Sequence, residues 1–426
     1  MNTRFYNARI LTMESGIAIK YGELWVKNNI IYFLGDIEKS PAPLFWDQEI
    51  DCKSNLLMPG FKNAHTHSSM TFLRSYADDL PLSEWLNKQV FPMEAKLKPE
   101  DIYHLSKLAI MEYLTSGITA NFDMYFYPDM NAKASVDTGF RTVLMSGISN
   151  FNSSTKELES EYITYNHYHD LISYRLGFHA EYTASKELLQ SISSIAHRYK
   201  APVFTHNSES ISEVESCIKA TGMTPTEYMD SLGLFEYGGG GFHCIHLSDN
   251  DMKIFKSRGM YAVTNPGSNM KLASGIAPLQ QMKSLGIPLA IGTDGAASNN
   301  CLDMFREMFL ASGLQKLKYD DASAMNAEDV LYMATVGGAK AMGLDNCDIL
   351  KKGRLADLIL IDLNQPNMQP LNNIAKNLVY SGSKINVKLT MIDGKILYHD
   401  GVFNIGINPD EVYFEANKCI NRMKNQ

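Results

Sequence analysis

The hydrophobic pattern of the middle of the chain alternates short apolar runs with longer helical stretches. Helical patterns lie between most of these runs, for instance at Pro99–Thr115, Ser185–Tyr199 and Ile276–Leu285. Strands that alternate with helices are typical of a parallel sheet covered by helices, and eight such repeats predict an α/β fold of the (β/α)₈ barrel type. The eight runs predicted as strands are Leu56–Pro59, Thr119–Phe122, Thr142–Met145, Arg175–Phe178, Val203–Thr205, Gly241–His243, Tyr261–Thr264 and Leu289–Ile291.

The two ends of the chain carry a different pattern, in which strands follow one another through short turns. Asn28-Asn29 and Asp393-Gly394 are turn-forming pairs that separate two of the predicted strands at each end. The pattern therefore predicts two small β units that flank the barrel. The predicted strands are Phe5–Met13, Gly22–Val26 and Ile30–Leu34 at one end, and Asp357–Asp362, Val387–Ile392 and Lys395–Tyr398 at the other.

Composition narrows the classes of partner. The chain has 426 residues and is 45% apolar, which fits a large core with a smaller accessory domain. Its 39 basic and 47 acidic residues give a net charge of −8, so a nucleic-acid-binding face is not expected. No apolar run approaches the length of about 18 residues that a membrane helix needs. The six cysteines are scattered, which favours reduced thiols and a cytoplasmic location.

His65-Thr66-His67 is the strongest candidate for metal chemistry. Residues two apart in a strand share a face, so His65 and His67 can enter one coordination sphere while Thr66 points away. Neutral imidazoles suit zinc, iron and similar metals, but two histidines are an incomplete site. A catalytic site needs at least one more protein ligand.

Other strand ends supply such ligands. Barrel enzymes place their catalytic groups at the carboxyl ends of the strands. Glu209, three residues after a strand-end histidine, is a candidate proton carrier. The polar residues at or directly after the predicted strands four, five, six and eight are His179, His206, His243 and Asp294.

Each of these residues also has an ordinary structural explanation. A single histidine at a strand end is more often a hydrogen-bonded structural residue, and Asp294-Gly295 is a common turn dipeptide. Glu209 could be a solvated side chain that a helix dipole favours. His246 is an alternative to His243 at the end of the sixth strand.

Four longer blocks carry a family resemblance: Pro59–His67, Leu73-Arg74 with Asp78–Leu82, Asn265–Gly275 and Gly292–Asn300. Together with the order of the histidines and Asp294, they resemble the amidohydrolase superfamily. More narrowly, they are similar to the methylthioadenosine/S-adenosylhomocysteine deaminases and the related chlorohydrolases. The resemblance spans the chain and implies a (β/α)₈ TIM barrel over residues 58–351. It also implies a composite β-sandwich built from residues 1–57 and 352–426.

The resemblance implies one divalent metal ion per chain, with zinc expected and iron as the alternative. Its ligands would be His65, His67, His206 and Asp294, with Glu209 and His243 beside it. His179 stands where two-metal relatives have a lysine, which favours a mononuclear site.

The implied reaction is hydrolytic deamination. Such a metal lowers the pKa of its bound water to about 7, which makes hydroxide available at neutral pH. Asp294 and His243 would help to take the proton of the water. Glu209 would contact a ring nitrogen of the substrate and protonate it, and ammonia would leave.

The resemblance also implies a substrate. Trp85, Glu94 and His179 match positions that contact an adenine nucleoside in similar enzymes. Arg141 is a candidate contact for a substrate carboxylate. One cation is a poor clamp, however, because the following segment, Thr142–Tyr174, contains no arginine. Glu181 stands where similar enzymes have an uncharged residue. We therefore expect 5'-methylthioadenosine or a related 5'-modified adenosine ahead of S-adenosylhomocysteine.

The sequence is also compatible with other functions. A guanine-type deaminase, a chlorotriazine hydrolase or a cyclic amidase could use the same scaffold, although Trp85 and Glu94 favour a ribose-bearing substrate. A non-catalytic binding protein is a more remote alternative, because the ligand set is complete. A small molecule is the expected partner, with no nucleic acid and no membrane, and a homo-oligomer is the default expectation.

Overall fold

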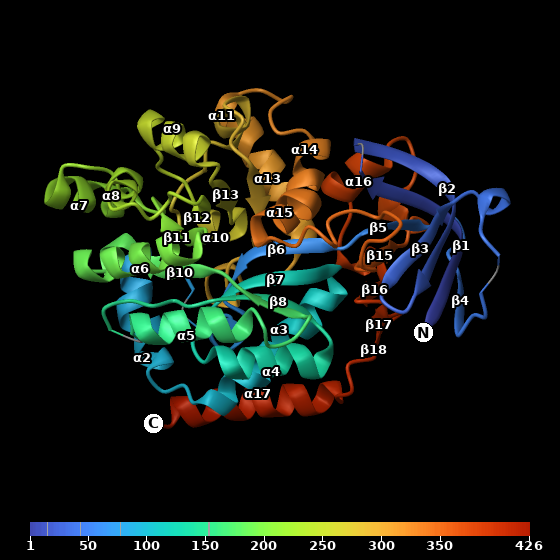
Figure 1. Ribbon diagram of the computed structural model, residues 1–426, viewed down its shortest axis with the longest axis horizontal. Helices are drawn as coiled ribbons and strands as arrows, with labels where there is room; N and C mark the ends of the chain where they lie inside the picture. Colours follow the sequence, from blue (N-terminus) through green and yellow to red (C-terminus); the bar gives the residue numbers. More distant parts are fainter. Residues whose placement is uncertain (15, 43, 77, 152–153) are drawn as a thin grey trace.

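The computed structural model describes residues 1–426 except 15, 43, 77, 152 and 153. Figure 1 shows parallel strands at the centre with helices around them, and a separate group of strands on the right that comes from both ends of the chain. Within the described residues, no helix is long and apolar enough to cross a membrane.

The central strands run parallel to one another in two sheets, with the orders β6-β7-β8-β9 and β10-β11-β12-β13-β14. Only Arg175 separates β9 from β10, and at the other side the Asp294 N–H donates to the His65 carbonyl at 3.0 Å. The bounds are β6 (Phe61–Thr66), β7 (Ile118–Met124), β8 (Arg141–Met145), β9 (Ile172–Tyr174), β10 (Leu176–Ala180), β11 (Val203–Asn207), β12 (Gly239–His243), β13 (Tyr261–Thr264) and β14 (Leu289–Ile291). The arrangement resembles a TIM barrel, but strand pairing alone does not close the two sheets into one.

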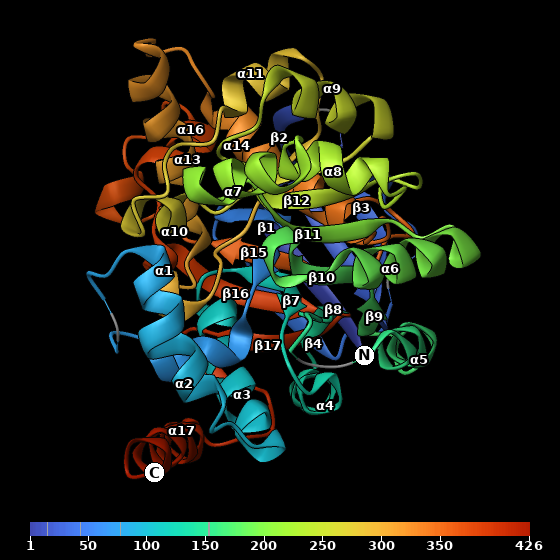
Figure 2. The ribbon, with the colours of Figure 1, turned by 90° about the vertical axis from the view of Figure 1, so that its left-hand side faces the viewer.

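Helices cover the outside of these strands, and Figure 2 shows several of them in front of the sheet. The inside is filled by apolar side chains, including Phe122, Phe204 and Phe242, whose rings pack edge-to-face or stack. The longer helices are α3 (Pro99–Thr115), α4 (Pro128–Thr138), α5 (Thr155–Tyr165), α6 (Lys186–Tyr199), α7 (Ile211–Thr221), α8 (Pro225–Ser231), α9 (Asp249–Arg258), α13 (Met304–Tyr319), α16 (Ile374–Tyr380) and α17 (Pro409–Lys424). The shorter ones are α1 (Leu82–Trp85), α2 (Phe91–Glu94), α10 (Pro266–Lys271), α11 (Leu279–Ser284), α12 (Ala296–Asn299), α14 (Ala327–Tyr332) and α15 (Gly338–Met342).

The first predicted barrel strand was placed too early. Leu56–Pro59 is β5, which pairs with β1 and β15 in the sheet of the chain ends, and the first central strand is β6. Gly60 allows the chain to pass between the two sheets, because a Cβ atom there would lie 2.1 Å from the Thr119 side chain. Leu56–Pro59 satisfies the apolar pattern of a buried strand, whereas Phe61–Thr66 is buried although most of its residues are polar.

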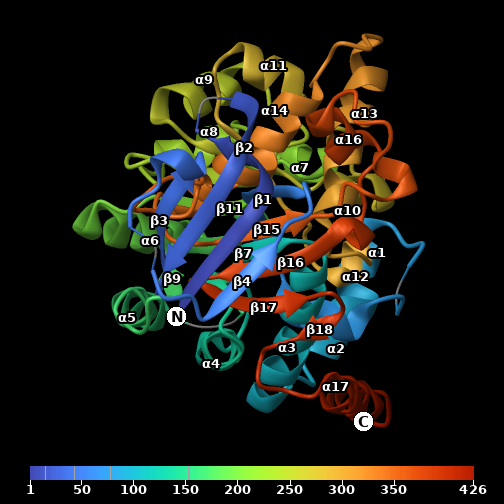
Figure 3. The same ribbon diagram turned by 90° about the vertical axis from the view of Figure 1, so that its right-hand side faces the viewer.

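The sheet of the chain ends has nine strands and follows the order β18-β17-β16-β15-β5-β1-β2-β3, with β4 paired to β1. Figure 3 faces this sheet and shows blue N-terminal strands beside orange-red C-terminal ones. All six strands predicted at the chain ends are present in it. The bounds are β1 (Asn2–Met13), β2 (Gly16–Lys27), β3 (Ile30–Gly35), β4 (Gln48–Asp51), β15 (Leu358–Ile361), β16 (Val387–Ile392), β17 (Lys395–His399) and β18 (Val402–Phe403).

The last helix leaves this sheet and returns to the helices around the central strands. α17 packs against α3, where Arg422 forms an ion pair with Asp101. Its buried residues Ala416, Cys419 and Met423 belong to an apolar cluster that also contains Trp85. The C-terminal segment therefore contacts the same apolar cluster as α1, which carries a predicted substrate contact.

Candidate metal centre and active site

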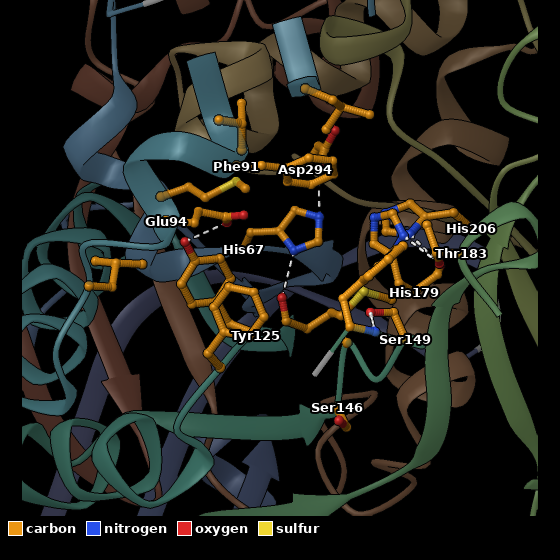
Figure 4. Close-up of a pocket in the computed structure, with 18 of the residues that line it drawn as sticks. His67, Phe91, Glu94, Tyr125, Ser146, Ser149, His179, Thr183, His206 and Asp294 are labelled. Carbon is orange, nitrogen blue, oxygen red and sulfur yellow. Dashed lines mark hydrogen bonds and ion pairs between the residues drawn. The ribbon is translucent and has the colours of Figure 1, made fainter. Parts of the chain in front are cut away.

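Two histidines and an aspartate meet at the carboxyl end of the central strands. His65 lies near the end of β6, His67 follows that strand, and Asp294 follows β14. The Asp294 Oδ1 atom lies 3.2 Å from His67 Nε2 and 3.6 Å from His65 Nε2. Figure 4 shows His67 and Asp294 facing one another across the pocket. The structure thus brings the first-strand pair and the eighth-strand aspartate together.

His206 and His243 complete the cluster from the two neighbouring strands, β11 and β12. His65, His67 and Asp294 form one group of ligand atoms within 4.8 Å of one another, and His65, His206 and His243 form a second. His65 belongs to both groups. Of the two candidates after the sixth strand, His243 lies in the cluster, whereas His246 bonds to the Ser274 carbonyl at 2.8 Å.

The donor set fits a cation. Both ring nitrogens of the buried His65 lack a hydrogen-bond partner within the described part of the chain, an arrangement that costs free energy unless something else binds there. His67 Nδ1 donates to the Met124 carbonyl at 2.6 Å, and His206 Nδ1 donates to the His179 carbonyl at 2.7 Å. These bonds fix each ring so that Nε2 is the free ligand atom.

Asp294 is held in one orientation by three donors. Its Oδ2 atom accepts from the Ser268 hydroxyl at 2.6 Å and from the Ser298 hydroxyl at 2.9 Å. Its Oδ1 atom accepts from the Gly295 N–H at 2.8 Å. The backbone of Asp294 has φ 58°, a left-handed conformation that aspartate tolerates better than most residues.

Glu209 lies in the turn after β11, with its carboxylate Oε2 atom 3.8 Å from His243 Nε2. The buried Glu213 holds this turn, because its carboxylate accepts from the N–H groups of Ser208 and Glu209 at 2.9 and 2.8 Å. Burial raises the pKa of Glu209 above its ordinary value, and the like charge of Asp294 adds to this effect. A raised pKa favours the protonated form of a carboxyl group, which is the form that can act as a general acid.

A cavity of about 1010 Å³ opens above the cluster. Trp85, Glu94 and His179, for which the sequence predicts substrate contacts, all line it. The Tyr125 hydroxyl donates to Glu94 Oε1 at 2.8 Å, and burial raises the pKa of Glu94 to about 7. Burial lowers the pKa of His179 to about 4, so this ring is neutral at pH 7. Figure 4 shows Glu94 and Tyr125 on one side of His67, and His179 and His206 on the other.

Arg141 does not reach the cavity, and its predicted role as a substrate contact is corrected. It is the first residue of β8 and therefore lies at the opposite end of that strand from the metal cluster. It is buried, and its guanidinium donates to both carboxylate oxygens of Asp357 at 2.7 and 3.1 Å. Glu181 is likewise not a lining residue, although its neighbours Tyr182 and Thr183 are.

The lining of the cavity is rich in carboxylates. Among the described residues that line it, none is lysine or arginine. Glu209 and Asp294 line it at the metal cluster. The carboxylates that line it elsewhere are Glu94, Asp129, Glu157 and Glu161.

Comparison with known proteins agrees with this geometry. The sequence profile of the amidohydrolase family matches residues 56–397 of the chain. The chain belongs to this family. As an amidohydrolase it is a hydrolytic enzyme that acts on carbon–nitrogen bonds.

Individual relatives cover nearly the whole amidohydrolase. A 5-methylthioadenosine/S-adenosylhomocysteine deaminase of Caldicellulosiruptor saccharolyticus is 40% identical over 403 residues, which are 94% of each chain. A 5'-deoxyadenosine deaminase of Methanococcus maripaludis is 37% identical over 412 residues, covering 95% of this chain and 97% of the relative. The crystal structure of an adenosine deaminase from Xanthomonas campestris with bound zinc has a TM-score of 0.94 at 30% identity, covering 100% and 99%.

Several residues that shape the amidohydrolase site were not singled out from the sequence. Tyr125, Ser268, Asn269 and Ser298 all bond to candidate site residues. Two of them lie in the Asn265–Gly275 block, whose similarity to a family was visible without any role for its members. The sequence contained the motif, but the roles of its residues became clear only from the atoms to which they bond.

Proposed function

We propose that this amidohydrolase is a metal-dependent deaminase of an aminated purine nucleoside, with 5'-methylthioadenosine or a related 5'-modified adenosine as substrate. One observation carries the proposal: a single cavity joins the metal cluster and Glu209 to Trp85, Glu94 and His179. Relatives that share 37–40% of the sequence and carry deaminase names support the same reaction.

We infer one divalent metal ion per chain, held by His65, His67, His206 and Asp294, with zinc expected and iron as the alternative. The unpartnered nitrogens of His65 support this assignment. When bound, such a metal lowers the pKa of water and so supplies a nucleophile at neutral pH.

The side chains around the centre handle the protons. His243 Nε2 lies 4.0 Å from Asp294 Oδ2 and 3.8 Å from Glu209 Oε2, so the three groups share one small volume. Asp294 and His243 accept the proton of the attacking water. Glu209 donates a proton to the ring nitrogen beside the amine-bearing carbon. A carbon–oxygen bond forms, the proton taken from water passes to the amine, and the carbon–nitrogen bond breaks as ammonia leaves. The proton of the new hydroxyl group returns to Glu209 as the carbonyl forms.

The remaining contacts position the nucleoside. Glu94 accepts hydrogen bonds from the ribose hydroxyls, Trp85 packs on the nucleoside, and the neutral His179 contacts the base. Tyr125 occupies one oxygen of Glu94 and leaves the other for the ribose.

An ammonia-release panel tests the proposal. The panel contains 5'-methylthioadenosine, 5'-deoxyadenosine, adenosine, guanine, cytosine, a pterin and an aminotriazine. We expect turnover of the adenosine derivatives only. Preferred turnover of guanine or of the triazine would replace the proposal by the corresponding alternative. No ammonia from any of these compounds with zinc-loaded protein would overturn deamination itself.

The charge of the cavity predicts a preference among 5'-substituents. S-adenosylhomocysteine carries a carboxylate beside its ammonium group, and this carboxylate would enter a cavity lined by Asp129, Glu157 and Glu161, with no lysine or arginine among the described lining residues to bind it. Repulsion between like charges is unfavourable, and a repulsion of about 1.4 kcal/mol lowers affinity tenfold. We therefore expect kcat/KM for 5'-methylthioadenosine to exceed that for S-adenosylhomocysteine at least tenfold. The methyl ester of S-adenosylhomocysteine is the control, and it should recover part of this loss. Equal kcat/KM for the two nucleosides would contradict this preference.

We also infer that the two parallel sheets form a closed (β/α)₈ barrel over residues 58–351. The hydrogen bond from Asp294 N to the His65 carbonyl supports closure on one side. Residues 1–57 and 352–426 then form the composite β-sandwich domain, from which α17 extends back to α3. Hydrogen exchange that protects the β6 and β14 amides to the same degree would agree with closure, whereas fast exchange confined to that side would contradict it.

We further infer a cytoplasmic location and a homo-oligomeric state. All six cysteines are free thiols, which supports a reducing compartment. Sedimentation of the purified protein tests the oligomeric state, and a monomer at micromolar concentration would contradict it.

A further inference from the structure

The helix after β13 bonds to both groups that are proposed to take the proton of water. Asn269, on α10, is 2% exposed, and its Oδ1 atom lies 2.7 Å from His243 Nδ1. An amide oxygen only accepts hydrogen bonds, so His243 Nδ1 carries the proton. In the neutral ring Nε2 is then the proton acceptor, and it faces Asp294 and Glu209.

The preceding residue of α10 acts on the aspartate. The Ser268 hydroxyl donates to Asp294 Oδ2 at 2.6 Å, and Ser298 of α12 donates to the same oxygen at 2.9 Å. With Oδ2 occupied by two hydroxyls, Oδ1 is the oxygen closer to His67 and His65. Two successive residues of one short helix thus orient two different groups of the site.

A buried carboxyl group holds this helix in place. Glu307 of α13 is fully buried, and its two oxygens accept from the Gly267 N–H and from Asn299 Nδ2, each at 2.8 Å. Gly267 makes this approach possible, because a Cβ atom there would lie 2.5 Å from Glu307 Oε1. Since Asn299 follows Ser298 on α12, Glu307 ties together the two helices that hold Asp294.

We propose that Asn269 and Ser268 are positioning residues for the hydrolytic step, Asn269 by fixing the tautomer and orientation of His243 and Ser268 by fixing those of the Asp294 carboxylate. The expected kinetic effects rest on the proposed function. The tautomer of His243 and the orientation of the Asp294 carboxylate do not depend on it. Partners of this kind typically contribute about 10- to 100-fold to activity or metal affinity.

A pair of substitutions at Asn269 separates orientation from packing. Asn269→Leu keeps the shape but removes the acceptor, whereas Asn269→Asp keeps an acceptor at the same place. We expect Asn269→Leu to lower kcat for 5'-methylthioadenosine by about 10- to 100-fold with KM and zinc content unchanged, and Asn269→Asp to retain most of kcat. Wild-type kcat in Asn269→Leu, or loss of zinc in parallel with kcat, would overturn the role.

A spectroscopic measurement tests the same claim without turnover. In protein with ¹⁵N-labelled histidine, we expect His243 to be the Nδ1–H tautomer in the wild type and in Asn269→Asp, and to lose this preference in Asn269→Leu. An unchanged His243 signal in Asn269→Leu would overturn the inference. If the wild type releases no ammonia from any nucleoside, the proposed function fails, and the tautomer measurement alone decides the role of Asn269.

Ser268 has a matched control in the same segment. The Ser274 hydroxyl is buried and has no hydrogen-bond partner within the described part of the chain. We expect Ser268→Ala to lower kcat several-fold at unchanged zinc content, and Ser274→Ala to leave it unchanged. Equal effects of the two substitutions on kcat would overturn the assignment of Ser268.

Discussion

Glu209 is the side chain on which the proposed proton transfer depends most directly. Replacing its carboxyl group by an amide removes the acid but keeps the shape of the side chain. We expect Glu209→Gln to lower kcat by about 10²- to 10⁴-fold while zinc content stays at the wild-type level. Glu215→Gln, on the exposed face of the following helix, is the control and should have wild-type kcat. Wild-type kcat in Glu209→Gln would remove Glu209 from the mechanism.

The proposed contact between Glu94 and the ribose predicts that KM depends on pH. Burial raises its pKa to about 7, so the carboxyl group is neutral below this pH and ionised above it. Only the ionised form offers acceptors to both ribose hydroxyls. We therefore expect KM for 5'-methylthioadenosine to rise as the pH is lowered from 8 to 6. Glu94→Gln should raise KM and abolish this dependence, and a pH-independent KM in the wild type would contradict the contact.

Residues differ in how far the sequence reveals their roles. His65, His67, His206 and Asp294 could be placed together because each ends or follows a strand, and parallel strands bring such residues to one edge. Arg141 directly precedes the predicted strand Thr142–Met145, and the same rule would have placed it at the far end. Asn269 could not be assigned, because its role depends on a single contact between α10 and the end of β12.

The Arg141–Asp357 ion pair joins two elements rather than serving the substrate. It connects β8 to the segment directly before β15 and is buried on both sides. Removing one partner of a buried pair typically costs 3–5 kcal/mol, so we expect Arg141→Met to lower the free energy of unfolding by about that amount. The double variant Arg141→Met/Asp357→Asn should recover part of the loss. Urea unfolding measures both.

Kinetics of the same variant test the correction of the substrate contact. We expect KM for both 5'-methylthioadenosine and S-adenosylhomocysteine to be unchanged in folded Arg141→Met. A large rise in KM for S-adenosylhomocysteine alone, at unchanged stability, would restore Arg141 as a contact of its carboxylate.

Elements were predicted well where the hydrophobic pattern and the length of the segment indicate the same structure. The bounds of α3 and β16 coincide with their predicted bounds. α11 begins later than predicted, because Pro278 disfavours the helical conformation of the residue before it, and the helix starts at Leu279. β5 was predicted as the first barrel strand in place of β6, because its apolar run indicates a buried strand but not the sheet to which it belongs, whereas β6 has mostly polar residues.

For the whole molecule, the metal should contribute to stability as well as to catalysis. A ligand that binds only the native state stabilises it by about 4 kcal/mol at a thousandfold excess over its Kd. We expect chelation to lower Tm by several degrees and abolish ammonia release, and zinc to restore both. His65→Asn is the control and should show little response of Tm to zinc. A Tm insensitive to chelation in zinc-loaded wild type would contradict a buried metal site.

The sheet built from both chain ends has a consequence for synthesis. β5 can pair with β1 as soon as the first 59 residues have emerged, but its other edge is covered by β15, about 300 residues later. At about 5–20 residues per second, the ribosome leaves that edge open for roughly 15–60 s. An open strand edge invites pairing with another chain. The nascent protein is thus most exposed to aggregation while its catalytic half is being made, and chains that terminate before residue 358 should be recovered mainly from the insoluble fraction.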